Sequence, residues 1–192
     1  DGATVTFVAD LPGGQRSPHD LTPLGGQVLF WAFQDSTGDE PWVSDGTAAG
    51  THLLVDLTPG PGDTRIGAAA PAGPRVYFSV SSQNLALYRT DGTAAGTEPV
   101  SGQLTFCFPG ISAGQVFLSN CLDALSNGAT YRFDATDAGP VKVGDQRLNG
   151  AGAALGGATV LSMSTTAEGD EPYVYEPADG GLRLLRDQNP GA

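Results

Sequence analysis

The sequence has little positive charge. Nine lysine and arginine residues stand against 21 aspartate and glutamate residues, which gives a formal net charge of −12 at pH 7. Nucleic-acid binding needs a basic surface that releases counterions from phosphates. The composition therefore argues against nucleic acid as a partner, and an anionic membrane surface would repel the chain for the same electrostatic reason.

Long apolar runs and histidine are scarce as well. No apolar run approaches the ~20 residues that a helix needs to cross a bilayer, so we predict no membrane span. The only histidines are His19 and His52. They are predicted on different strands, which leaves no basis for a triad of nucleophile, histidine and acid. We therefore expect that the chain is not an enzyme.

Cysteine occurs only twice, as Cys107 and Cys121. The two cysteines are equally far in sequence from Gly114. This glycine lies in a turn-like segment between two apolar runs. A hairpin folded at Gly114 would bring them opposite each other, at a separation that a disulfide accepts. We predict a Cys107–Cys121 disulfide, which favours an oxidising compartment outside the cytoplasm. Two buried thiols in a cytosolic core are the alternative.

What the sequence does contain is a repeat. An aromatic residue precedes an acid by three positions in four phrases, at residues 42–45, 88–91, 131–134 and 173–176. The successive aromatics are 46, 43 and 42 residues apart, a period typical of repeat proteins. Four strand-length segments, separated by glycine-rich or acidic turns, surround each phrase. Four short strands in about 45 residues, beginning with small side chains, are typical of a β-propeller blade.

We therefore predict an all-β chain, a β-propeller of four-stranded antiparallel blades. A sandwich, the other all-β solution, would not need this period. The expected units are a surplus outer strand at residues 1–13 and about four blades, at residues 14–60, 61–104, 105–146 and 147–192. The surplus strand matches the last strand of other units, so it could complete a blade in a neighbouring chain by strand addition.

Two phrases are specific enough to indicate a family. The stretch Glu40-Pro41-Trp42-Val43-Ser44-Asp45-Gly46-Thr47 resembles the ELWxxDGT repeat of bacterial secreted and surface proteins, common in myxobacteria, and residues 85–97 form a second clear copy. Pro41 and Ala86 depart from its first positions, and the third and fourth units lose the Gly-Thr. The resemblance implies an extracytoplasmic, propeller-like array, and it supplies no catalytic residue.

The repeated residues are interpreted as structural. An aspartate can accept backbone N–H bonds across a turn, and a following glycine tolerates positive φ, while the aromatics are expected to pack between blades. The residues assigned this role are Trp42, Asp45, Gly46, Tyr88, Asp91, Gly92, Tyr131, Asp134, Tyr173 and Glu176.

Candidate ligand-binding residues lie in the acidic loops between the second and third strands of a unit. They are Asp35, Asp39, Glu40, Asp123, Glu168, Asp170 and Glu171. Calcium prefers several oxygen ligands, so Asp35, Asp39 and Glu40 could bind this ion, although their spacing matches no ordered calcium loop. The other interpretation is a solvated acidic rim that keeps the protein soluble.

The sequence thus favours a non-catalytic secreted or cell-surface module that binds a protein or a glycan through its acidic loops, or a structural segment of a larger surface assembly. The alternative is an extracytoplasmic hydrolase or lyase that uses loop carboxylates, with or without calcium. Asp39 and Asp170 could then face one pocket as a glycosidase pair. No other cofactor is predicted.

Overall fold

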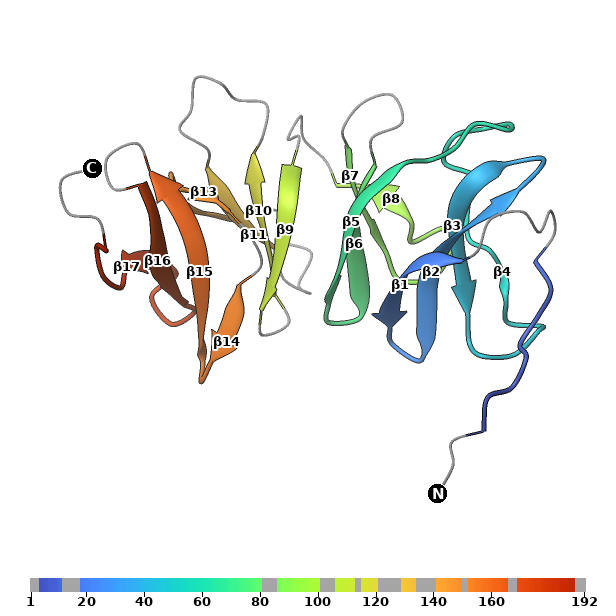
Figure 1. Cartoon of the computed structure of the whole chain (residues 1–192), viewed down its shortest axis with the longest axis horizontal. Coiled ribbons are helices and arrows are strands. Elements are labelled where there is room, and N and C mark those ends of the chain that lie inside the picture. The colour runs from blue at the N-terminus through green and yellow to red at the C-terminus, as the bar shows by residue number, and fades with distance from the viewer. Residues whose placement is uncertain are drawn as a thin grey trace.

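The computed structural model describes residues 4–11, 18–80, 86–100, 106–112, 115–120, 129–133, 141–149, 152–165 and 169–188. All regular structure in these residues is β-strand, and the strands form four antiparallel sheets that follow one another along the chain (Figure 1). The all-β prediction is confirmed. Within the same ranges, no helix is long and apolar enough to cross a membrane.

The strands of each sheet are nearly all paired in chain order. Sheet 1 contains β1 (His19–Leu24), β2 (Gln27–Gln34), β3 (Gly38–Ser44) and β4 (His52–Leu53). Sheet 2 contains β5 (Ile66–Ala72), β6 (Arg75–Val80), β7 (Ala86–Thr90) and β8 (Glu98–Pro99). Sheet 3 contains β9 (Phe106–Ser112), β10 (Gln115–Asn120), β11 (Thr130–Phe133) and β12 (Val141–Gly144). Sheet 4 contains β13 (Arg147–Leu148), β14 (Ala153–Leu155), β15 (Ala158–Thr165), β16 (Gly169–Glu176) and β17 (Gly181–Leu184), with β13 and β14 both paired to β15.

The first hairpin of sheet 1 and that of sheet 4 close through the same two-residue turn. Gly25-Gly26 joins β1 to β2, and Gly156-Gly157 joins β14 to β15. Gly25 and Gly156 have φ angles of 58° and 61°, a left-handed conformation that tight hairpin turns require and that glycine adopts without strain. Sheets 1 and 4 therefore present the same turn at the same place.

An irregularity in the first strand recurs from sheet to sheet. In sheet 1 the pairing shifts by one residue between His19, opposite Trp31, and Thr22, opposite Leu29. The same one-residue shift occurs between β5 and β6 and between β9 and β10, and in sheet 4 the first strand is divided into β13 and β14. Asp20, inside the sheet 1 bulge, has a φ of 51°, a conformation that aspartate tolerates better than most residues.

The hydrophobic core lies between neighbouring sheets. Between sheets 1 and 2, the Trp31 ring meets the Phe78 ring edge-on at a centroid distance of 5.3 Å. Between sheets 2 and 3, Tyr77 and Phe133 lie 5.3 Å apart. Val143 of sheet 3 packs with a buried cluster of sheet 4. The sheets therefore stack face to face in a row, with sheets 1 and 4 at its two ends (Figure 1).

The repeated aromatics occupy these layers with one exception. Tyr88, Tyr131 and Tyr173 pack in the clusters between sheets. Trp42 instead packs with Phe30 on another face of sheet 1, in a separate cluster. Its place in the repeat is the same, but among the described strands no sheet packs on this face of sheet 1 (Figure 1).

The segment at residues 4–11, expected to be part of a surplus outer strand, does not form a strand in the described structure. A strand requires a ladder of backbone hydrogen bonds to a partner, and this segment belongs to none of the four sheets. It lies beside sheet 1 instead, where Leu11 packs against the cluster of Phe30 and Trp42. Within the described part of this chain the segment is therefore unpaired, and its role as an outer strand that pairs with another chain stays a prediction.

Candidate functional site

The Asp-Gly-Thr phrases of the first two units form two closely matching turns. The backbone N–H and hydroxyl of Thr47 both donate to Asp45 Oδ1, at 2.9 and 2.7 Å, and Gly50 N donates to Thr47 Oγ1 at 3.0 Å. Residues 91–97 repeat these bonds at 2.9, 2.7 and 3.0 Å. The bonds stabilise the ionised carboxylates, so the pKa values of Asp45 and Asp91 are lowered. In this structure both acids serve the turn.

The remaining repeated acids lie elsewhere. Asp134 is outside the described residues. Glu176 is exposed, and its Oε1 accepts a bond from Arg183 Nη2 at 3.4 Å, while the turn after it closes through backbone bonds from Asp179 and Gly180. The fourth unit therefore has a different turn, in line with its loss of Gly-Thr.

Replacing Gly96 with alanine is expected to lower the free energy of unfolding by about 1–3 kcal/mol. A Cβ atom at this position would lie 2.1 Å from Asp91 Oδ1, so the carboxylate would have to leave its two donors. Gly26→Ala is the matched control, because nothing lies within 4 Å of its Cβ. Urea denaturation measures both variants, and equal losses would show that the crowding at Gly96 has no effect.

Two acids expected in ligand-binding loops are buried inside the fold. Glu40 is 0% exposed. Its oxygens accept bonds from Leu57 N at 2.9 Å, Thr58 N at 3.2 Å and Thr64 Oγ1 at 2.6 Å. Burial raises the pKa of Glu40, although these bonds oppose the rise. This carboxylate therefore fastens the connection from sheet 1 to sheet 2.

Glu171 occupies the same position in sheet 4. It is buried, and its Oε2 accepts a bond from Gln188 N at 2.9 Å. A signal for this burial was present in the sequence, because each glutamate lies two residues before a repeated aromatic, Trp42 or Tyr173. Residues two apart in a strand share a face. The pattern therefore placed both acids on the face of a core aromatic.

Asp39 contacts a histidine of the first strand. His19 Nε2 lies 2.9 Å from Asp39 Oδ2, and His19 Nδ1 lies 2.7 Å from Asp20 Oδ2. Ionised carboxylates only accept hydrogen bonds, so this geometry suits an imidazole whose two ring nitrogens both donate, as they do in the protonated form. Partial burial lowers the pKa of His19, but the bond to Asp20 and the charge of Asp39 outweigh it, and the pKa is raised.

Asp170 of sheet 4 has a comparable arrangement. Its Oδ1 accepts bonds from Ser164 Oγ and, at 2.6 Å, from Asn149 Nδ2. The bond from Ser164, with that from Asn149, lowers the pKa of Asp170. Asp39 and Asp170 lie in sheets at opposite ends of the row (Figure 1). The structure therefore does not bring the two acids together in one pocket.

Of the remaining ligand candidates, one is exposed and two lie outside the described residues. Asp35 is exposed in the turn between β2 and β3, whereas Asp123 and Glu168 are outside the described residues. Among the residues with described positions, no three histidine, cysteine, aspartate or glutamate side chains form a group that could hold a metal ion. Of the three acids proposed for calcium, Glu40 is occupied by protein donors and Asp39 by His19.

One of the two cysteines of the predicted disulfide lies outside the described residues. Cys107 belongs to β9, and its backbone is opposite Ser119 of β10. The one-residue bulge in this hairpin sets that register. Cys121 is not among the described residues, so the disulfide remains a prediction.

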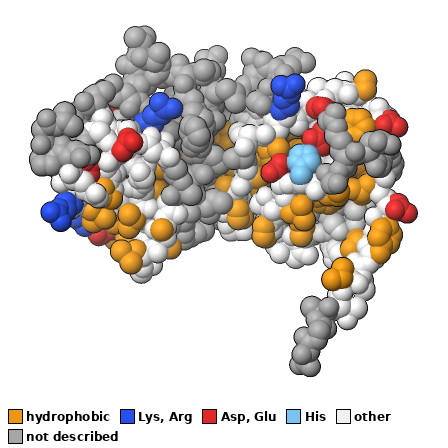
Figure 2. Space-filling model, viewed as in Figure 1, with side chains coloured by type: hydrophobic (Ala, Val, Ile, Leu, Met, Phe, Trp, Pro, Cys, Tyr) orange, Lys and Arg blue, Asp and Glu red, His pale blue; other side chains and the backbone are white. Residues whose placement is uncertain are grey.

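The exposed polar site that remains is the His19 cluster, which consists of His19, Asp20 and Asp39. It lies at the edge of sheet 1 where β1 begins and where the turn from β2 to β3 carries Asp35. The side chains of His19 and Asp20 are 39% and 56% exposed, and Asp63 Oδ1 accepts a bond from Asp39 N at 3.1 Å. Figure 2 shows a histidine bordered by acidic side chains on this face. Such a group can accept hydrogen bonds and attract cationic groups.

Comparisons with known proteins bear on the fold. No family model matches the chain, and no curated protein matches it in sequence. Among solved structures, the chain is similar to a puromycin hydrolase, with 16% identity and a TM-score of 0.60 over 91% of this chain and 29% of that one. It is also similar to a prolyl endopeptidase, with 11% identity and a TM-score of 0.62 over 89% of this chain and 29% of that one.

A third similar structure is TolB from Acinetobacter baumannii, with 12% identity and a TM-score of 0.51 over 84% of this chain and 41% of that one. The chain thus spans less than half the length of each of these proteins. At such low identity the likeness concerns the backbone arrangement alone. Together with the row of antiparallel sheets, it shows that the chain has a β-propeller-like fold.

Proposed function

We propose that this chain is a non-catalytic, extracytoplasmic propeller module that binds a protein or glycan ligand through the loop edge of sheet 1. A role as a structural segment of a larger surface assembly is compatible with the same fold. The observation that supports binding is the exposed His19 cluster, in which the pair of His19 and Asp20 has no counterpart among the repeated residues. By contrast, the repeated acids Asp45 and Asp91 and the buried Glu40 serve the fold itself.

The chemistry of the cluster supports a ligand that is cationic or rich in hydroxyl groups. Asp20 and Asp35 are exposed at one edge of sheet 1, and Asp39 is oriented by His19 and by Asp63. Carboxylates at an exposed edge attract lysine and arginine side chains of a protein or accept bonds from sugar hydroxyls, and a net charge of −12 adds long-range attraction for a cationic partner.

The alternative, an extracytoplasmic hydrolase or lyase, has less support. A glycosidase needs two carboxylates about 5–10 Å apart, and the pair considered for this role, Asp39 and Asp170, belongs to sheets 1 and 4. Similarity to hydrolases at 16% identity or below carries no activity to this chain.

The proposed location outside the cytoplasm rests on the ELWxxDGT resemblance and on the predicted disulfide.

A double variant tests the binding edge. Asp20→Asn with Asp35→Asn is expected to weaken binding to an immobilised oligolysine peptide by about fivefold to tenfold at low salt. Asparagine tolerates the positive φ at position 20. The control, Asp145→Asn with Asp179→Asn, removes the same charge at exposed positions away from this edge, and we expect less than about a twofold change.

A glycan panel, assayed with the same variants, separates the two ligand classes. Equal losses in the test and control variants would mean that net charge alone attracts the peptide, and would contradict the proposed site. Turnover on a panel of glycosidase and esterase substrates, abolished by Asp39→Asn, would favour the enzymatic alternative instead.

A further inference from the structure

The contact between sheets 1 and 2 includes a specific fit between two turns. The turn after β1 lies against the Asp-Gly-Thr turn of the second unit: a Cβ atom on Gly92 would lie 2.5 Å from Gln27 Oε1 and 3.2 Å from Leu24 Cδ2. Leu24 is only 4% exposed in this position. The Leu24-Gly25-Gly26 turn of one sheet therefore fits against the Asp91-Gly92 turn of the next sheet.

The face of sheet 2 that packs on sheet 1 has a counterpart in sheet 1, and none of the sheets formed by the described residues covers it. Phe30 pairs with Trp42 in its ladder as Phe78 pairs with Tyr88 in sheet 2, so the face that carries Phe30 and Trp42 corresponds to the face of sheet 2 that packs on sheet 1. A Cβ atom on Gly46 would meet nothing within 4 Å, whereas Gly92 is in contact. We call this face of sheet 1, with its Asp45-Gly46 turn, the head.

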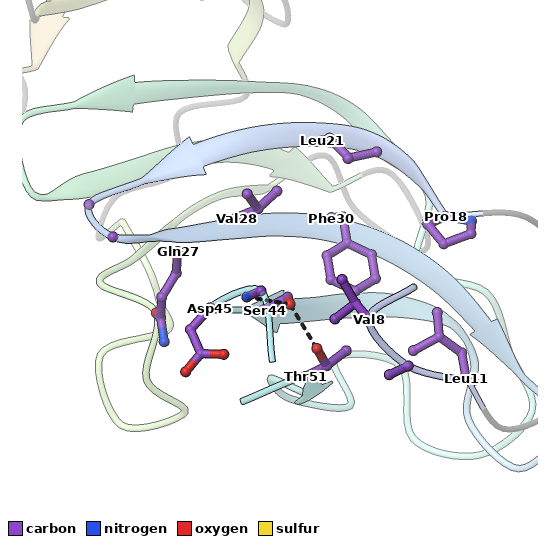
Figure 3. Close-up of a pocket in the computed structure, with 14 residues that line it drawn as sticks. Val8, Leu11, Pro18, Leu21, Gln27, Val28, Phe30, Ser44, Asp45 and Thr51 are labelled. Atoms are coloured by element: carbon purple, nitrogen blue, oxygen red, sulfur yellow. Dashed lines mark hydrogen bonds between the residues drawn. The ribbon is translucent and has the colours of Figure 1, made fainter. Parts of the chain in front are cut away.

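The head contains a groove of about 590 Å³. Figure 3 shows Leu21, Val28 and Phe30 on one side of it, and Val8 and Leu11 of the segment at residues 4–11 beside Phe30. The Asp45-Gly46 turn closes one end of the groove. Leu21 is 65% exposed, so the segment at residues 4–11 leaves apolar surface of the head in contact with solvent.

Sheet 4 presents the complementary surface at the other end of the row. Burial alternates along β15: Leu161 and Met163 are buried toward sheet 3, while Ser162 between them is exposed. The Leu155-Gly156-Gly157 turn has the sequence and the glycine φ of the turn after β1. Leu155 is nevertheless 66% exposed. We call this turn and the exposed face of β15 the tail.

We propose that two copies of this chain associate head to tail. The Leu155-Gly156-Gly157 turn of one copy fits against the Asp45-Gly46 turn of the other, and Leu155 enters the groove beside Phe30, as Leu24 packs at Gly92 within one chain. In the register of the sheets, the small Ser162 takes the place of Trp31 in the tail. Phe30 and Trp42 of the head are already buried beside Leu11 and Leu53, so the contact is made by the two turns and by Leu155 at the exposed Leu21.

This contact is heterologous, because it joins two different surfaces. It needs no strand addition by residues 4–11, and it leaves one head and one tail free in each pair of copies. The groove adjoins the proposed ligand-binding edge at Leu21, but Asp20 and Asp35 of that edge do not line it.

Complementation between two variants tests the proposal. Leu21→Asp damages the head and Leu155→Asp damages the tail, and both residues are exposed, so neither change should affect folding; circular dichroism and thermal melting check this. The mass of the wild-type chain by sedimentation should rise with concentration. Each variant alone should lose association by about a hundredfold, because the interface would bury an unpaired carboxylate. An equimolar mixture should recover a dimer, since it contains one intact head and one intact tail.

Three results would overturn the proposal. If the wild-type chain stays monomeric throughout the dilution series, the head does not bind the tail of a second copy, and a sheet from a different polypeptide segment would be the expected partner of the head. Association of Leu155→Asp at wild-type strength would indicate a symmetric head-to-head contact. Loss of association on deleting residues 1–11, with Leu155→Asp unaffected, would indicate strand addition.

Discussion

Replacing Glu40 with alanine is expected to lower the free energy of unfolding by about 3–5 kcal/mol, because each buried donor left unpaired costs about 1–3 kcal/mol. Glu40 is fully buried, and Leu57 N, Thr58 N and Thr64 Oγ1 all donate to it. Urea denaturation measures the loss. Glu98→Ala is the control: Glu98 is half-exposed and pairs with Arg89 at the surface, so its removal should cost less than about 1 kcal/mol.

The same site should make stability depend on pH. The pKa of Glu40 is raised by burial from its ordinary value of 4.5, so the folded state holds the proton more tightly than the unfolded state does. The stabilisation linked to this proton is complete below pH 4.5 and is lost as pH rises through the raised pKa. The Glu40→Gln variant lacks this proton and should not show that part of the loss. Parallel stability curves for wild type and Glu40→Gln above pH 4.5 would contradict the assignment.

The second large effect is expected at Trp31. Trp31→Ala should cost about 3–5 kcal/mol, as large-to-small substitutions of buried aromatics do. The Trp31 side chain is completely buried between sheets 1 and 2 and meets Phe78 edge-on. Trp42→Ala should cost less, because Trp42 packs in a small cluster with Phe30, Ala32, Leu11 and Leu53, whereas Trp31 lies in the larger cluster between two sheets.

Trp31→Phe controls for the size of the ring. The indole Nε1 of Trp31 is buried and has no hydrogen-bond partner in the described structure. Phenylalanine therefore keeps most of the packing and loses no bond seen there, and we expect a cost below about 1.5 kcal/mol. All three variants are measured by chemical denaturation. A loss at Trp42 equal to that at Trp31 would contradict the placement of the main core between sheets 1 and 2.

The sequence predicted those features that depend on local pattern. The period of the aromatics and the glycine turns correctly indicated antiparallel sheets built from consecutive strands. The sequence also suggested that Asp45 and Asp91 accept bonds inside their turns, and the structure contains those bonds. These features depend on residues within a few positions of each other, so spacing and turn chemistry are sufficient to identify them.

Features that depend on distant contacts were missed. Glu40 was grouped with the loop acids because acids are dense around it, but its donors lie 17 to 24 residues further along the chain. The segment at residues 4–11 has the sequence of an outer strand, but strand pairing depends on a partner strand whose position the sequence alone does not give. The bond from His19 to Asp39 spans 20 residues, and it depends on how β1 begins beside β3.

The buried glutamates have a consequence for the local stability of individual sheets. Sheets 1 and 4, which stand at the two ends, each keep a glutamate before the repeated aromatic, whereas sheets 2 and 3 have Ala86 and Ala129 at this position. In stacked repeats a unit is held by its own bonds as well as by its neighbours. In sheets 1 and 4 the carboxylate binds the segment after the outer strand to the third strand, a bond that an alanine side chain cannot form, so these two units hold that segment with a contact of their own.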